Sequence, residues 1–190
     1  MTVKLLIRKE KMAETVTFTG MILTASPMKE FDKRVEVLTK ERGRISAFAR
    51  GARRLNSTLS ACTVPFTFGK FTFYEGRNAY NLVSGDIETY FEEITTDYDA
   101  LCYASYFAEM VQYLSREGIE AAEELLLMYI TMRALQNRRI SFEHKHWRLF
   151  HIVVRHWSNW KHPYLSVISI LTRLHISIWF INKFNSSAVN

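Results

Sequence analysis

Hydrophobic and polar residues alternate over short stretches in the first ninety positions, and this pattern predicts β-strands. Residues 15–25 (TVTFTGMILTA) are rich in β-branched and aromatic side chains and predict the first strand, with a bulge at Gly20. We expect Ser26 and Pro27 to end this strand, because proline cannot donate a strand hydrogen bond. The strand pattern resumes over residues 34–39 (RVEVLT).

The segment after residue 39 predicts the second half of a β-hairpin. Residues 41–43 (ERG) form the tight turn. The next strand alternates strictly between two sets of side chains, a core set (Ile45, Ala47 and Ala49) and an outer set (Arg44, Ser46, Phe48 and Arg50). We expect Gly51 to end this strand and residues 52–54 (ARR) to follow as a basic loop.

Two further strands are expected after a polar connection over residues 55–65. Residues 66–74 (FTFGKFTFY) form a strongly aromatic strand, and the turn 75–78 (EGRN) leads into residues 79–83 (AYNLV). The four phenylalanines of the aromatic strand do not share one parity, so at least half of them are expected in the core. Short strands joined by glycine turns predict a small barrel.

The hydrophobic period then changes to that of helices. Residues 97–117 and 119–139 each place apolar side chains on one face, as amphipathic helices do. We expect Thr96 or Asp97 to cap the first helix and Gly118 to end it. Because the connection is short, the two helices are expected to pack antiparallel as a hairpin.

Charge and composition change abruptly after residue 143. Residues 1–143 contain 19 Lys and Arg against 19 Asp and Glu, whereas residues 144–190 contain six cations and no acid. All six histidines and all four tryptophans also lie in residues 144–190, which contain no glycine. The net charge of +6 therefore comes from residues 144–190, while the preceding residues balance to zero. We interpret this anomalous basic tail as foreign to the preceding domain, such as an out-of-frame read-through.

The stretch most informative about function is residues 44–54 (RISAFARGARR), which with residues 40–42 contains six cations and one acid. A strand that exposes Phe48 between cations and ends in a guanidinium cluster suits a nucleic-acid backbone with unstacked bases. The alternative is a solvated basic edge strand, whose charge only prevents aggregation.

The hypothesis of nucleic-acid binding names nine candidate residues. Cations displace counterions from phosphates without sequence preference, and aromatic side chains stack bases. The phosphate candidates are Lys33, Arg34, Arg42, Arg44, Arg50, Arg53 and Arg54, and the stacking candidates are Phe48 and Tyr74. For Lys33 and Arg34 the alternative is that they only follow an exposed turn after Pro27.

An ordered string of segments resembles the bacterial DNA repair protein RecO family. The segments are FTGMILTASPMKEFDKRVEVLTKERGRISAFARGARR, PFTFGKFTFYEGRNAYNLVSGDIETYF and DYDALCYASYFAEMVQYL, in that order. The resemblance covers about residues 15–143 and depends on a long run of residues and their order. It implies an α+β fold, in which an N-terminal oligonucleotide/oligosaccharide-binding (OB) β-barrel precedes a truncated α-helical domain.

The resemblance also implies the domain organisation and the function. We expect an extension over 1–14, an OB-fold nucleic-acid-binding domain over 15–90, a helical hairpin over 95–143 and the tail over 144–190. Family members bind single- and double-stranded DNA, anneal complementary strands and act in DNA repair and recombination. With the partner RecR they assist loading of the RecA recombinase onto DNA coated by single-strand-binding protein, whose acidic tail they bind. The resemblance thus implies a cytoplasmic, nucleoid-associated protein.

Two departures from the family change these expectations. Many members have a cysteine zinc site in the helical domain, but no cysteine follows Cys102 here, so no zinc is expected. The later family helices are also replaced by the tail. Because the tail of single-strand-binding protein docks on the helical domain in the family, we expect that docking to be weakened in this chain.

Enzymatic and metal chemistry find little support in the sequence. No phosphate-binding glycine loop is present, and no histidine precedes residue 144 to complete a nucleophilic triad. His144, His146, His151 and His156 have no helical i,i+4 spacing, and residues 144–190 contain no acid or thiol. We therefore expect no catalytic residue, no metal, no cofactor and no small-molecule substrate.

Membrane insertion and disulfide formation are also not expected. Residues 164–184 are apolar, but Arg173 and His175 near their middle make a membrane span costly. Cys62 and Cys102 form no paired motif, and a reducing compartment fits them.

Two other functions remain open. One is a general OB-fold binder of single-stranded nucleic acid with no role in recombinase loading, which would hold strands without accelerating their pairing. The other is an adaptor that binds proteins through its barrel, for which replacing Arg50, Arg53 and Arg54 would leave single-strand binding unchanged.

Overall fold

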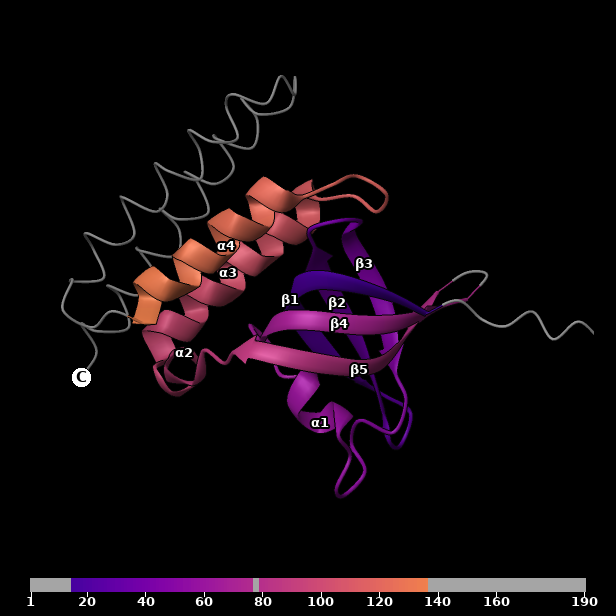
Figure 1. Ribbon diagram of the computed structural model, residues 1–190. Helices are drawn as coiled ribbons and strands as arrows, with labels where there is room; N and C mark the ends of the chain where they lie inside the picture. Colours follow the sequence, from indigo (N-terminus) through magenta and orange to yellow (C-terminus); the bar gives the residue numbers. More distant parts are fainter. Residues whose placement is uncertain (1–14, 77–78, 137–190) are drawn as a thin grey trace, which may run out of the picture. The chain divides into compact units, whose positions relative to one another are not determined.

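The computed structural model describes residues 15–76 and 79–136 (Figure 1). The chain divides into two units, Met1–Arg139 and Ile140–Asn190, and every described residue belongs to the first. The expectations for the extension over 1–14 and for the tail over 144–190 lie outside the described residues.

Five strands form a closed barrel in the order β1-β2-β3-β5-β4. The strands are β1 (Thr15–Met28), β2 (Asp32–Thr39), β3 (Gly43–Ala49), β4 (Phe68–Glu75) and β5 (Tyr80–Thr89). Neighbouring strands pair antiparallel except β3 and β5, which are parallel. The barrel predicted from the strand pattern is confirmed, and its five strands followed by helices agree with an OB fold.

The barrel core contains the side chains that the alternation assigned to it. In β3, Ile45, Ala47 and Ala49 are buried, while Arg44 and Phe48 are partly exposed. Phe71 and Phe73 are fully buried with the other core residues of the barrel. The remaining members of that cluster are Phe18, Ile22, Val35, Val37, Ala52, Leu59, Cys62, Tyr80 and Leu82.

The first strand differs from its prediction in two ways. It continues through Ser26 and Pro27 to Met28, because β4 pairs with β1 only as far as Met21 and beyond that point β1 pairs with β2 alone. Proline has no amide hydrogen to donate, and none is needed on the side of Pro27 that faces away from β2, because β4 does not pair with β1 there. The register shift lies between Ile22 and Thr24, so the bulge expected at Gly20 was wrongly placed. A Cβ at Gly20 would lie 2.5 Å from the Leu38 carbonyl oxygen, which explains the glycine.

The connection before β4 also contains structure that the sequence did not predict. Leu59–Cys62 form the short helix α1, which contacts β5 and adds Leu59 and Cys62 to the barrel core. Phe66 is buried but has φ +66°, so it lies outside the strand and β4 begins at Phe68.

Three helices follow the barrel: α2 (Glu92–Thr96), α3 (Tyr98–Leu114) and α4 (Ala122–Gln136). Asp97 caps α3, because its Oδ1 accepts a hydrogen bond from the Ala100 amide at 3.1 Å. The α3 and α4 helices lie side by side, as expected for the hairpin (Figure 1). The last part of the predicted second helix, residues 137–139, lies outside the described residues.

The helices are shorter at their connection than predicted. The α3 helix ends at Leu114, before Gly118, because the connection pairs with the turn between β2 and β3 instead of continuing the helix. The Gly118 amide donates to the Arg42 carbonyl and the Ala121 amide donates to the Lys40 carbonyl, both at 2.9 Å.

A second core lies between the barrel and the helices. Met21 and Leu38 are paired across β1 and β2, and neither is exposed, although neither belongs to the barrel core. Because β1 contacts α3 and α4, and β2 contacts α4, these outward side chains are covered by the helical layer. Among the described residues no helix is long and apolar enough to cross a membrane. The apolar segment at residues 164–184 lies outside them.

Candidate nucleic-acid interface

The outer face of β3 forms the centre of the candidate interface, which we call the β3 wall. Its members are Arg44, Ser46, Phe48 and Arg50, which alternate with the buried core positions of the strand and its end. Since alternate residues in a strand lie roughly 7 Å apart, Arg44 and Arg50 are separated by roughly 20 Å. This length matches several nucleotides of an extended single strand.

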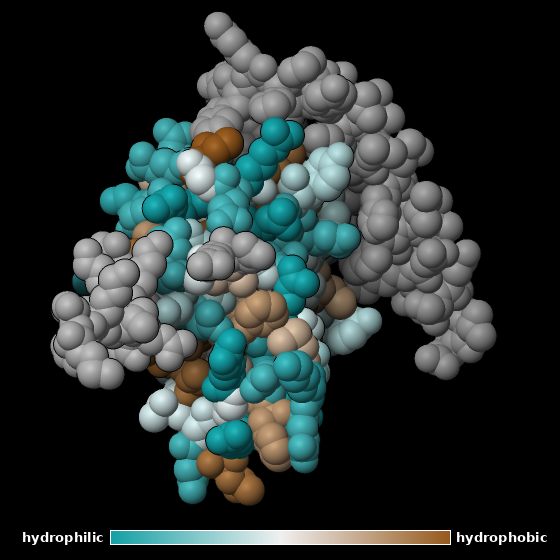
Figure 2. All heavy atoms as spheres, turned by 90° about the vertical axis from the view of Figure 1, so that its right-hand side faces the viewer, coloured by the Kyte–Doolittle hydropathy of each residue, from teal (hydrophilic) through white to brown (hydrophobic). Residues whose placement is uncertain are grey.

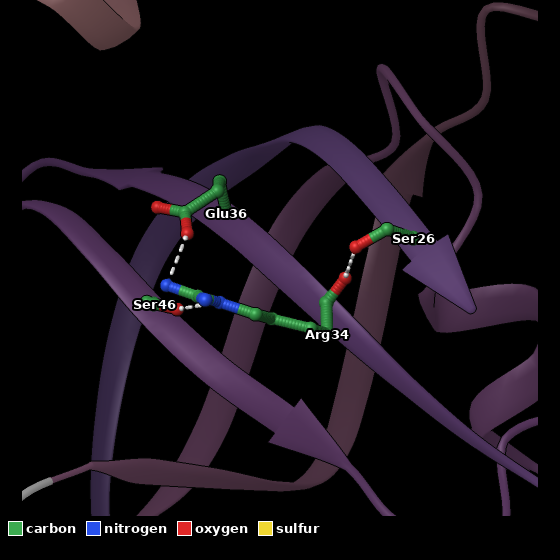
Figure 3. Close-up of polar contacts among 4 residues, drawn as sticks. All are labelled: Ser26, Arg34, Glu36 and Ser46. Atoms are coloured by element: carbon green, nitrogen blue, oxygen red, sulfur yellow. Dashed lines mark hydrogen bonds and ion pairs between the residues drawn. The ribbon is translucent and has the colours of Figure 1, made fainter. Parts of the chain in front are cut away.

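Arg34 adds to this wall from the neighbouring strand. It lies opposite Phe48 in the pairing of β2 with β3. Its Nε donates to Ser46 Oγ at 2.8 Å, and its Nη2 lies 3.4 Å from Glu36 Oε1, so the guanidinium reaches across the strands (Figure 3). The side chain remains 54% exposed. The guanidinium thus already contacts two protein groups, although a solvent-exposed ion pair such as that with Glu36 is weak.

Two cations, Arg53 and Arg54, contact Phe31 at the end of the barrel, and we call these three residues the Phe31 cap. The Arg54 guanidinium carbon lies 5.5 Å from the centre of the Phe31 ring, and the Arg53 amide donates to the Phe31 carbonyl at 2.9 Å. Arg53 Nη1 also donates to the Lys29 carbonyl at 3.4 Å. Phe31 is 41% exposed, so part of this residue is accessible to solvent.

The turn that presents this cap depends on Gly51 and Asp32. Gly51 has φ +69°, a conformation that favours glycine, and its amide donates to Asp32 Oδ1 at 2.8 Å. Phe31 was not among the residues chosen from the sequence. An aromatic residue in a predicted turn between basic positions was the signal that would have found it.

The second stacking candidate lies in the same row of the barrel as Phe48. Strand pairing connects Phe48 to Asn81 and Asn81 to Tyr74, so Arg34, Phe48, Asn81 and Tyr74 form one row across four strands. Two strand spacings separate Phe48 from Tyr74, roughly 10 Å. Tyr74 is 39% exposed and lies between the buried Phe73 and the exposed Glu75.

Two of the chosen cations lie apart from the wall and the cap. Lys33 has the parity of the core residue Val35, and its Nζ donates to Thr63 Oγ1 at 3.1 Å. Arg42 lies in the turn between β2 and β3, at the opposite end of β3 from the Phe31 cap. Of the nine candidates, four therefore lie on the wall, two in the cap and two apart, while Tyr74 lies in the row that continues from Phe48.

A groove opens where β3 and β5 separate. These strands pair at two positions only: Ala47 pairs with Tyr80, and Phe48 pairs with Asn81. The groove has a volume of about 360 Å³, and we call it the hairpin groove. It is lined by Arg34, Ser46, Phe48, Glu75, Gly76, Ala79, Tyr80 and Glu117.

The polar groups of the hairpin groove are the two carboxylates of Glu75 and Glu117, the Arg34 guanidinium and the hydroxyls of Ser46 and Tyr80. Tyr80 Oη donates to Glu75 Oε1 at 3.4 Å. Burial raises the pKa of Tyr80, the negative charge of Glu75 raises it further, and Arg42 opposes both, so the hydroxyl stays protonated. Beside the groove, Asn81 Oδ1 is buried and has no hydrogen-bond partner within the described part of the chain.

The acidic and cysteine side chains of the described residues show no arrangement typical of a metal site. No three His, Cys, Asp or Glu side chains among them are placed to hold a metal ion. Glu92 and Glu93 lie in the first turn of α2 and Asp99 in that of α3, where acids favour the helix dipole. Burial raises the pKa of Cys62, which keeps its thiol protonated.

The face of the barrel on which β3 lies combines polar and apolar areas. Figure 2 shows the molecule from the right-hand side of Figure 1, where β3 and the end of the β4–β5 hairpin lie. This face is mostly hydrophilic, and hydrophobic side chains gather in its lower half. Such a surface offers charge to phosphates and apolar area to bases.

Known proteins resemble this chain over the same region. The family described as Recombination protein O N terminal matches residues 12–91. "DNA repair protein RecO" of Clostridium perfringens is 35% identical over 125 residues, which are 65% of this chain and 50% of the relative. The protein of the same name from Clostridium acetobutylicum is 33% identical over 112 residues, which are 59% of this chain and 45% of the relative.

A more distant relative gives the same result. "DNA repair protein RecO" of Alkaliphilus metalliredigens is 30% identical over 124 residues, which are 65% of this chain and 50% of the relative. The chain spans about half the length of the curated relatives it matches. The resemblance predicted from the sequence is confirmed, and the family model described as Recombination protein O N terminal matches the part of the chain that contains the whole barrel.

Proposed function

We propose that this protein binds single- and double-stranded DNA through the β3 wall and the Phe31 cap, and that it acts in DNA repair and recombination. The observation that supports this most directly is the arrangement of Arg44, Phe48 and Arg50 on one outward strand face, which leads towards Arg53 and Arg54. The relatives named DNA repair protein RecO support the cellular role.

Affinity would come mainly from phosphate neutralisation. Arg44 and Arg50 lie on the wall, and Arg53 and Arg54 are exposed at its end. Each cation that contacts a phosphate releases condensed counterions, and this release favours binding without sequence preference. If ~4 cations act in this way, raising salt from about 50 to 200 mM weakens single-strand binding roughly fiftyfold.

Aromatic side chains would add stacking to this electrostatic attraction. Phe48 lies between the cations of the wall, Tyr74 lies in the same row, and Phe31 lies under the Arg54 guanidinium. Stacking contributes about 1–3 kcal/mol for each base. Because every base has an apolar face, the interaction tolerates any sequence.

Annealing would follow from the same surface. A cationic wall lowers the repulsion between two strands held on it, so that complementary strands meet more often. Assistance in RecA loading, with RecR and the tail of single-strand-binding protein as partners, stays a proposal that rests on the family alone.

A titration of single-stranded DNA against the full chain at two salt concentrations tests the proposal. We expect the triple substitution Arg50→Ala, Arg53→Ala and Arg54→Ala to weaken binding at least tenfold and to lower the salt dependence. Lys70→Ala serves as the matched control, because Lys70 is an exposed cation on β4 away from the wall.

Two outcomes would contradict the proposal. If binding has no salt dependence, phosphate neutralisation is not its basis. If the triple variant binds as tightly as the original chain, the protein fits an adaptor better. Annealing rates of complementary oligonucleotides then separate an annealing protein from a binder that only holds strands.

A further inference from the structure

The hairpin groove differs in charge from the wall beside it. Among the described residues of its lining, Glu75 and Glu117 contribute two carboxylates and Arg34 contributes one guanidinium, which already contacts Glu36 and Ser46. Within the described part of the chain, the Glu117 carboxylate has no ion-pair or hydrogen-bond partner, and that of Glu75 accepts only from Tyr80. A phosphate would be repelled here, whereas a neutral hydrogen-bond donor would be attracted.

The groove also offers an apolar surface of the kind that bases use. Phe48 lines it from β3, and Gly76 and Ala79 line it as well. Glycine and alanine have the smallest side chains, so these two residues take up little of the groove. The volume of about 360 Å³ lies within the range of sites for small organic molecules, on the order of 300–1,000 Å³.

A nucleobase with an exocyclic amino group has the matching chemistry. The amino groups of cytosine and adenine donate hydrogen bonds, and Glu and Asp side chains are common acceptors for cytosine. Thymine has a carbonyl oxygen at the corresponding position. That oxygen would face carboxylates, and the Arg34 and Tyr80 donors of the lining already bond to protein acceptors.

We propose that the hairpin groove holds one unstacked base against Phe48 and prefers bases with an exocyclic amino group, whose N–H groups donate to Glu75 and Glu117. The neighbouring phosphates of the same strand lie on the cations of the β3 wall. This inference rests on the proposed function and adds a base preference to an otherwise sequence-tolerant surface.

Fluorescence anisotropy with oligo(dC) and oligo(dT) of equal length tests this preference in the full chain. Both are pyrimidine homopolymers, so they have the same charge and differ at the base edge. At neutral pH and fixed salt we expect oligo(dC) to bind about fivefold or more tightly. The double variant Glu75→Ala and Glu117→Ala should bind oligo(dT) more tightly, because repulsion is removed, and should lose the preference for oligo(dC).

A matched control separates local contacts from net charge. Glu88→Ala removes an exposed acid of β5 that does not line the groove, so it should leave the ratio of the two affinities unchanged. Equal binding of oligo(dC) and oligo(dT) by the original chain would overturn the base preference while leaving DNA binding intact. A preference that persists in the double variant would also overturn it. Failure of both oligonucleotides to bind would instead refute the proposed function.

Discussion

The guanidinium of Arg54 lies over the ring of Phe31, with its central carbon 5.5 Å from the ring centre. The two residues come from different turns, one between β1 and β2 and the other after β3. The Arg53 amide connects the same turns through its hydrogen bond to the Phe31 carbonyl. A cation and an aromatic ring are thus held together at the end of the barrel, where a base would stack beside a phosphate contact.

Replacing Phe31 by Ala is expected to weaken single-strand binding by about 1–3 kcal/mol, at least ~fivefold, because one stacking surface is lost. The salt dependence should stay the same, since no cation is removed. Anisotropy titrations at two salt concentrations measure both quantities. Leu55→Ala is the control, because Leu55 is an exposed hydrophobic residue of the following loop. Equal losses in both variants would argue against stacking on Phe31.

Gly43→Ala is expected to destabilise the protein strongly. Gly43 has φ +67°, and an added Cβ would lie too close to the backbone carbonyl oxygens of Arg116 and Ile119. We expect the substitution to lower the free energy of unfolding by about 2 kcal/mol or more, from backbone strain together with overpacking. Denaturant titration followed by circular dichroism measures this change.

Gly118→Ala is the control for Gly43→Ala. Gly118 also has a positive φ, +83°, but a Cβ there would meet no atom within 4 Å. Gly118→Ala should therefore lower the free energy of unfolding only through backbone strain, by about 1 kcal/mol. If both variants lose the same stability, the close approach of the helix connection to the turn at Gly43 does not matter for folding.

The two cysteines are expected to differ in reactivity. Cys62 is buried, and burial raises the pKa of its thiol above the usual value, so little thiolate forms near neutral pH. Cys102 is partly exposed. Under native conditions an alkylating reagent should therefore modify Cys102 first, and mass spectrometry of the digested protein measures the order. Denaturant should remove the difference, and faster modification of Cys62 in the folded protein would contradict its burial in the barrel.

Stability is expected to fall at alkaline pH, in part through Tyr106. Burial, with a smaller effect of the Glu109 charge, raises the pKa of Tyr106 to about 12. Tyrosine in an unfolded chain has a pKa of about 10. Because the folded state binds this proton more tightly, its contribution to stability is complete below pH ~10 and is lost as pH rises towards 12.

Tyr106→Phe should reduce this alkaline loss, since the variant has no proton to lose at that position. Denaturant titrations between pH ~8 and ~12 measure the free energy of unfolding for both proteins. Tyr113→Phe is the control, because Tyr113 is 78% exposed and should leave the pH dependence unchanged. Identical pH profiles for Tyr106→Phe and the original chain would show that another group controls the alkaline transition.

The local pattern of the sequence determined which segments became strands and helices, because alternation and helical period depend only on neighbouring residues. Ile45, Ala47 and Ala49 were assigned to the core from their spacing and are buried. The same local information misplaced the end of β1. Whether Pro27 interrupts a strand depends on which neighbour the strand has there, and that is a property of the sheet.

The candidate site was predicted in its residue types and only partly in its arrangement. Charge and alternation identified the β3 wall, since both are local. Lys33 has the same charge, yet its Nζ bonds to Thr63, thirty residues away along the chain. Phe31 became part of the site only because its turn lies beside the one that contains Arg54.

The sequence alone thus determined the strands, the helices, the resemblance to the RecO family and the basic outer face of β3, because short-range patterns and residue order encode them. The tertiary structure decided which cations share a surface, where Phe31 meets Arg54, and that the paired Met21 and Leu38 are buried outside the barrel core. These relationships depend on contacts between residues distant in sequence. Such contacts arise when the barrel closes and the helices pack on it.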